Sequence, residues 1–188
     1  MFTPILLAVA ILIIAFVVVV LLRPADFRVE KSATISAPGE IAFAQVNDLH
    51  QWAAWSPWEK IDPALKRSYA GPAAGTCTSY AWAGNQKLGE GRMTITESHP
   101  SDFIRIKLEF LKPFKATHTA EFRFKTERNQ TVVTWSMFGK HNFMGKAMGL
   151  VMNCDKMLGS QFEKGLAQLK STVEASTEHV GLASTGLR

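Results

Sequence analysis

The sequence predicts an α+β domain in which a strongly curved antiparallel β-sheet wraps around a long C-terminal α-helix, preceded by an N-terminal transmembrane helix. Between Phe27 and Phe138, short segments alternate apolar and polar residues, as strands with one buried face do. From Met144 to Val173, apolar residues recur at helical spacing. The chain also opens with an unbroken apolar run, Ile5–Leu22, which is long enough to cross a bilayer.

The apolar run has two interpretations, a retained anchor and a cleaved secretory signal. A signal would carry positive charge before the run and small residues at a cleavage site. Residues 1–4 have no charged side chain, and Leu21-Leu22-Arg23-Pro24 is a poor cleavage site. We therefore expect residues 1–25 to form a retained single-pass anchor, with the lipid bilayer as the partner of Ile5–Leu22. Arg23, Arg28 and Lys31 follow the run, so the positive-inside tendency places the domain on the cytoplasmic side of the inner membrane.

The alternating segments predict one strand, two short helices and six further strands. The first strand is Phe27–Ile35, and the short helices are Glu40–Val46 and a segment from Asp48 through Trp55. Gly, Pro and Asn residues separate the later strands, which are Lys66–Ala70, Thr76–Trp82, Lys87–Glu97, Phe103–Leu111, Lys115–Lys125 and Thr131–Phe138. Consecutive strands joined by short turns form an antiparallel meander.

The pattern of Met144–Val173 predicts one helix of roughly 45 Å, at ~1.5 Å per residue. Asn142 can cap its start, and the apolar steps of three and four are interrupted only between Val151 and Leu158, where Asp155 lies. Such a helix needs a broad apolar surface, which the sheet can supply. Its glycines and methionines fit either a cavity or a core filled by adaptable side chains.

Composition restricts the function classes. The chain has 188 residues, which predicts one folded domain at 26–175, and residues 176–188 read as a flexible tail. Its net charge of +5 comes from basic residues spread singly along strands, so nucleic acid is not an expected partner. Cys77 and Cys154 offer no zinc spacing, and neither a phosphate-binding loop nor a metal motif is present, so no metal and no cofactor are expected.

Several local motifs resemble one known superfamily. Asp48-Leu-His-Gln-Trp-Ala-Ala-Trp-Ser-Pro57 resembles its Asp-x-x-x-Trp-x-x-Trp-x-Pro corner, and Pro38, Gly89-Glu90-Gly91 and Gly159–Leu166 also match. The chain from about residue 27 to 174 thus resembles the helix-grip fold of the SRPBCC superfamily, which includes START domains, birch-pollen-allergen-like proteins and polyketide cyclases/dehydrases. The resemblance implies a hydrophobic cavity between sheet and helix that holds an apolar or amphipathic small molecule.

Two ionisable residues fall on predicted apolar faces. His118 shares the inward parity of Phe122 and Phe124, and Asp155 lies at the centre of the helical stripe. As a catalytic pair, His118 would act as base while Asp155 fixes its tautomer. A structural contact and orientation of a ligand are the alternatives. The full set of candidate ligand-binding residues is Trp55, Trp58, Tyr80, Phe110, His118, Phe122, Trp135, Met148, Met152 and Asp155.

The anchor and the implied cavity favour membrane-tethered binding of a lipid-like, isoprenoid or polyketide-like molecule. Two other functions remain open. One is a cyclase, aromatase or hydrolase that uses His118 and Asp155 in the same cavity without metal or nucleotide. The other is a module with a solid core that serves protein interaction or stress response.

Overall fold

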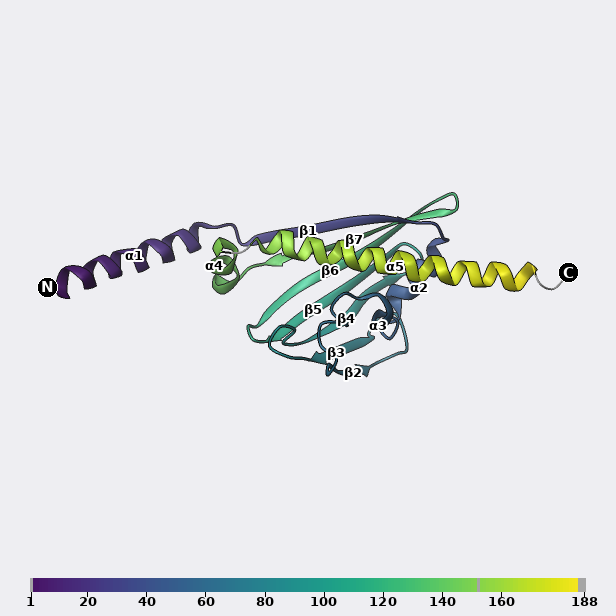
Figure 1. Cartoon of the computed structure of the whole chain (residues 1–188), viewed down its shortest axis with the longest axis horizontal. Coiled ribbons are helices and arrows are strands. Elements are labelled where there is room, and N and C mark those ends of the chain that lie inside the picture. The colour runs from purple at the N-terminus through teal and green to yellow at the C-terminus, as the bar shows by residue number, and fades with distance from the viewer. Residues whose placement is uncertain (1, 152, 186–188) are drawn as a thin grey trace.

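The computed structural model describes residues 2–151 and 153–185, which form five helices and seven strands in the expected order (Figure 1). The elements are α1 (Phe2–Leu22), β1 (Asp26–Ile35), α2 (Gly39–Asn47), α3 (Trp52–Trp55), β2 (Lys66–Ala70), β3 (Ser79–Ala83), β4 (Glu90–His99), β5 (Phe103–Lys112), β6 (Ala116–Glu127), β7 (Gln130–Lys140), α4 (Phe143–Val151) and α5 (Cys154–Thr185). This arrangement confirms the predicted fold class.

All seven strands form one antiparallel sheet with the order β1-β7-β6-β5-β4-β3-β2. Strands β2 to β7 follow one another as the predicted meander, and β1 closes the series by pairing with β7 from Asp26↔Lys140 to Ile35↔Thr131. The other edge strand, β2, is exposed along its whole length. The pairing of β4 with β5 is irregular between Ile95 and Glu97, where the register of the two strands shifts.

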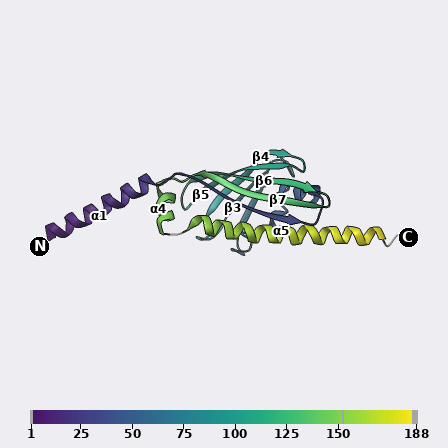
Figure 2. The ribbon, with the colours of Figure 1, turned by 90° about the horizontal axis from the view of Figure 1, so that it is seen from above.

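Helix α5 lies along one face of the sheet (Figure 2). Phe162, Leu166, Leu169 and Val173 are buried, as their spacing predicts. The ring of Phe162 stacks on that of Trp135 in β7, with centroids 4.2 Å apart. Lys31 of β1 lies on the apolar face, and its side chain extends to the solvent-exposed Glu163 of α5. Lys31 Nζ lies 2.5 Å from Glu163 Oε1.

The expected single helix Met144–Val173 is wrong, because the chain forms two helices instead. Asn142 Oδ1 accepts a hydrogen bond from Gly145 N at 2.8 Å, which is the expected cap for α4. Asn153 Oδ1 accepts one from Lys156 N at 2.9 Å, so a second Asn side chain caps the start of α5. Asp155 therefore lies in the exposed first turn of α5 and not at the centre of a buried stripe. At the other end, α5 continues to Thr185, beyond the expected start of the tail at residue 176.

The segment Asp48–Trp58, here named the tryptophan-rich corner, fills one end of the interior. Trp52 Nε1 donates to Val46 O at 2.9 Å, and Trp55 Nε1 donates to Gln45 O at 3.1 Å, so both indoles are tied to the end of α2. Trp55 is completely buried, and its ring lies edge-on to Phe122 and Trp135. Both indoles are thus fixed in the interior of the domain.

Helix α1 extends away from the sheet and is almost entirely exposed (Figure 1). Thr3–Leu22 is long and apolar enough to span a membrane, and a signal sequence near an N-terminus has the same properties. Arg23 Nη1 donates to Gly149 O at 2.9 Å, so the end of α1 is joined to α4.

Replacing Leu169 by alanine is expected to lower the free energy of unfolding by about 2–5 kcal/mol, because a fully buried side chain leaves a cavity under α5. Denaturant unfolding of the detergent-solubilised chain, followed by tryptophan fluorescence, measures the loss. Met157→Ala on the same helix is the matched control, since Met157 is 55% exposed. Equal losses in the two variants would contradict the observed docking face.

Candidate ligand-binding cavity

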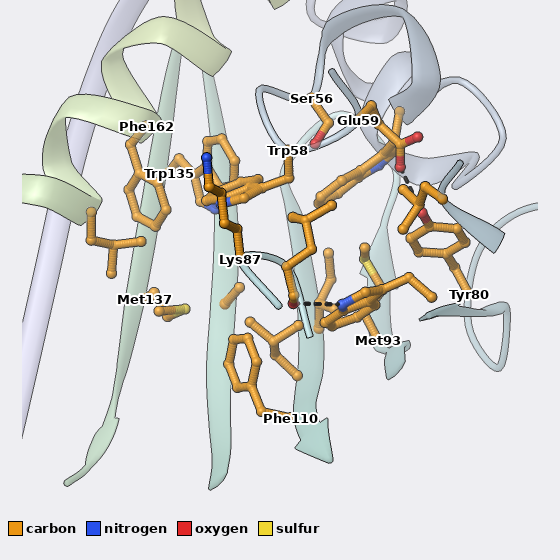
Figure 3. Close-up of a pocket in the computed structure, with 18 residues that line it drawn as sticks. Ser56, Trp58, Glu59, Tyr80, Lys87, Met93, Phe110, Trp135, Met137 and Phe162 are labelled. Atoms are coloured by element: carbon orange, nitrogen blue, oxygen red, sulfur yellow. Dashed lines mark hydrogen bonds between the residues drawn. The ribbon is translucent and has the colours of Figure 1, made fainter. Parts of the chain in front are cut away.

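A cavity of about 220 Å³ lies between the sheet, α5 and the segment that follows α3 (Figure 3). Strands β4, β5 and β7 supply most of its apolar wall, through Met93, Ile106, Leu108, Phe110, Trp135 and Met137. Leu158 and Phe162 of α5 close one side, and Trp58 contributes from the tryptophan-rich corner. The lining is therefore dominated by carbon, as in most small-molecule sites.

Four of the lining residues are polar or charged: Ser56, Glu59, Tyr80 and Lys87. The Tyr80 hydroxyl donates to Glu59 Oε1 at 2.6 Å, while Arg67 Nε donates to Glu59 Oε2 at 2.7 Å. Burial and the neighbouring Glu59 carboxylate raise the pKa of Tyr80 far above its usual range, so the hydroxyl stays protonated and remains a donor. Figure 3 shows this pair on the side of the cavity away from Phe162.

Trp135 Nε1 and Lys87 Nζ have no protein partner in the part of the chain that the structure describes. Trp135 is 2% exposed, and its Nε1 is buried and forms no hydrogen bond. Leaving such a buried N–H unpaired costs about 1–3 kcal/mol. Lys87 is exposed at the cavity and forms no ion pair with a described carboxylate. An anionic group of a ligand would pair with Lys87.

The structure brings four of the candidate ligand-binding residues together at the cavity: Trp58, Tyr80, Phe110 and Trp135. Trp55 and Phe122 are fully buried and do not line it. Met148 lies on α4 with 41% of its side chain exposed, and Met152 lies outside the described residues. Neither His118 nor Asp155 lines the cavity.

His118 and Asp155 do not form the expected base and orienting carboxylate. His118 packs edge-on against Phe27, with ring centroids 4.9 Å apart, and lies near Phe110 and His141. Its Nδ1 is buried without a hydrogen-bond partner among the described residues. Burial and the nearby His141 lower the pKa of His118, so the ring is neutral near pH 7. Asp155 is exposed and lines a separate polar hollow of about 610 Å³.

Sequence reasoning missed Glu59, Lys87 and Ser56. All three lie in irregular segments, where neither strand nor helical periodicity assigns a direction to a side chain. The charged residues offered one signal, since Glu59 directly follows Trp58 and Lys87 begins a predicted strand. That signal does not distinguish them from the many solvated charges of the chain.

His118 makes the folded state sensitive to acid. Because the pKa of His118 is lower in the folded chain, the unfolded chain binds more protons just below the usual histidine pKa of about 6.5. We expect the free energy of unfolding to fall as the pH drops below this value. In His118→Phe, whose ring suits the aromatic neighbours, the fall should be smaller. Denaturant unfolding at a series of pH values measures both slopes, and identical slopes would contradict a neutral buried His118.

Known structures share this fold at low sequence identity. The di-domain aromatase/cyclase StfQ from the steffimycin biosynthetic pathway matches with a TM-score of 0.60 and 14% identity, over 82% of this chain and 52% of that one. The Aha1 dimer from Colwellia psychrerythraea has a TM-score of 0.56 at 14% identity, covering 79% and 96%. For Ara h 8.0201 the TM-score is 0.54 at 10% identity, covering 80% and 99%. At such identities these likenesses show the fold alone.

No curated protein matches the sequence closely enough to count as a relative. A sequence model of one family does match, over residues 26–174, and this span leaves out α1 and the last turns of α5. That family is described as polyketide cyclase/dehydrase and lipid transport. Both descriptions concern hydrophobic molecules, in keeping with the apolar cavity. The chain belongs to this polyketide cyclase/dehydrase and lipid transport family, and through it to the SRPBCC superfamily.

Proposed function

We propose that the chain binds a small amphipathic molecule at the membrane surface, with the apolar part of the ligand inside the cavity. The observation that carries the proposal is an apolar cavity with Lys87, an exposed cation without an ion-pair partner among the described residues, at its edge. The apolar body of a ligand packs against the carbon-rich wall. A carboxylate or phosphate oxygen pairs with the Lys87 ammonium group.

The volume limits the size of the ligand. Common ligand pockets measure about 300–1,000 Å³, whereas this cavity holds about 220 Å³. If a methylene occupies roughly the ~30 Å³ of a water molecule, the space accommodates about seven methylenes. A short acyl chain, one segment of a longer lipid or a small ring system fits, and a complete phospholipid does not.

The strand register supports uptake from the side of the anchor. The β3–β4 turn, the β5–β6 turn and the start of β1 all lie at one end of the sheet. The strand pairs that place them there are Gly91↔Phe110, Phe110↔Ala116, His118↔Gly139 and Asp26↔Lys140. Helix α1 joins the sheet at that end, and Lys87 and Leu88 of the β3–β4 turn line the cavity. With α1 in a bilayer, this part of the cavity faces the membrane.

The geometry favours binding over the two other functions. Catalysis by His118 and Asp155 lacks support, because neither residue lines the cavity and Asp155 is exposed. A completely solid core is also disfavoured, because a cavity of about 220 Å³ lies between the sheet and α5. The polyketide and lipid-transport activities of the family both begin with binding of this kind.

Straight-chain carboxylates from four to twelve carbons test the proposal directly. We expect the affinity to rise by about 0.8 kcal/mol, roughly fourfold, for each methylene that enters the cavity. The rise should level off near eight carbons, where the available volume of about 220 Å³ is filled. Isothermal titration calorimetry of the detergent-solubilised chain measures the series.

Two leucine substitutions on β6 provide the matched comparison. Ala120 faces the cavity, and Ala120→Leu fills part of it, whereas Thr119 points to the opposite face of the same strand. Ala120→Leu should weaken octanoate binding at least tenfold, and Thr119→Leu should leave it unchanged. Equal affinities in the two variants, or no dependence on chain length, would refute binding in this cavity.

Lys87 should distinguish charged from neutral ligands. Replacing Lys87 by glutamine is expected to weaken octanoate binding about two- to fivefold, because an exposed ion pair contributes up to ~1 kcal/mol. Binding of 1-octanol should not change, and raising the salt concentration should remove the difference. The same calorimetric titrations measure all three. An equal loss for acid and alcohol would show that Lys87 acts on packing and not on charge.

A further inference from the structure

We propose that α4 and the β5–β6 turn form a second membrane contact, which lays the ligand-binding domain on the surface of the bilayer that α1 crosses. The proposal rests on the membrane span assigned to α1 under the proposed function. It adds a docking face on the folded domain itself, with a lipid bilayer rich in anionic lipid as its occupant.

Exposed apolar side chains are concentrated at this face. The described part of the chain exposes eight large apolar side chains outside α1, and five of them lie on α4, on the β5–β6 turn or beside that turn. These five, here named the apolar patch, are Leu111, Phe114, Phe143, Met144 and Met148, each between 41% and 49% exposed. A patch this localised marks an interaction site more often than chance exposure does.

The elements that carry the patch are joined to one another and to the end of α1. Asn142 Nδ2 donates to Lys115 O at 3.2 Å, which connects the start of α4 to the β5–β6 turn. Lys146 Nζ donates to Leu21 O at 3.3 Å, and His141 N donates to Ala25 O at 2.8 Å. In both ribbon views α4 lies between the end of α1 and the sheet (Figures 1 and 2). If α1 spans the bilayer, these bonds hold α4 at the depth where lipid headgroups begin.

The charge around the patch suits an anionic surface. Arg23, Lys115, Lys140 and Lys146 form no ion pair with a carboxylate among the described residues. The acidic residues Asp26 and Asp155 line the hollow that Arg23 and Lys146 also line, so they offset part of this charge. Each basic residue close to anionic lipid strengthens attraction to the membrane surface. Apolar side chains flanked by such residues are typical of segments that lie in the membrane interface.

Site-specific fluorescence quenching tests the proposal on the full chain. In a Cys77→Ser, Cys154→Ser background, single cysteines replace Met144 in the patch, Leu22 at the end of α1 and Asn129 in the β6–β7 turn at the far end of the sheet. Each is labelled with nitrobenzoxadiazole and reconstituted into vesicles of phosphatidylcholine with about 30% phosphatidylglycerol. Lipids carrying a nitroxide near the headgroup quench only labels that enter the interface.

We expect strong quenching at Met144 and Leu22 and none at Asn129. Adding Phe114→Ser and Phe143→Ser should reduce quenching at Met144 by at least half and leave Leu22 unchanged, since both replaced side chains are exposed. Quenching at Leu22 without quenching at Met144 would overturn the docking face while the span of α1 stands. Absence of quenching at both positions would overturn the span and the docking face together. Octanoate binding in detergent would still report separately on the cavity.

Discussion

The structure depends on one stack of three aromatic rings. Trp135 of β7 lies between Phe122 of β6, with centroids 4.8 Å apart, and Phe162 of α5, with centroids 4.2 Å apart. The stack joins the sheet to the helix through flat surfaces that bury a large apolar area. It also separates the interior into two parts, because the tryptophan-rich corner packs edge-on around it while the cavity opens beside it. One contact thus joins the sheet to α5 and forms part of the wall of the candidate site.

The two parts differ because of side-chain size and hydrogen bonding. At the tryptophan-rich corner, the N–H groups of Trp52 and Trp55 are paired with backbone carbonyls. At the cavity, small residues such as Ala120 leave space. A domain that only needed stability would fill that space. The unfilled apolar space makes the cavity the candidate site.

Much of the fold was predictable from the sequence, because strand alternation and helical spacing report directly on burial. The inward parity of Ile104, Ile106 and Phe122 holds in the structure. The break between α4 and α5 was not predicted, although the interrupted spacing between Val151 and Leu158 marks it. Periodicity carries no information on where a helix is recapped by a residue such as Asn153. It carries none on loop residues such as Glu59 either, so three of the four polar residues that line the cavity could not be deduced.

The edge strand β2 has a consequence for crowding. A strand with open backbone groups invites pairing with a second copy of the chain. This strand is only five residues long and begins with Lys66 and Arg67. Short length and charged side chains are features by which natural edge strands avoid such pairing. Many copies of the chain can therefore crowd together without joining into a larger sheet.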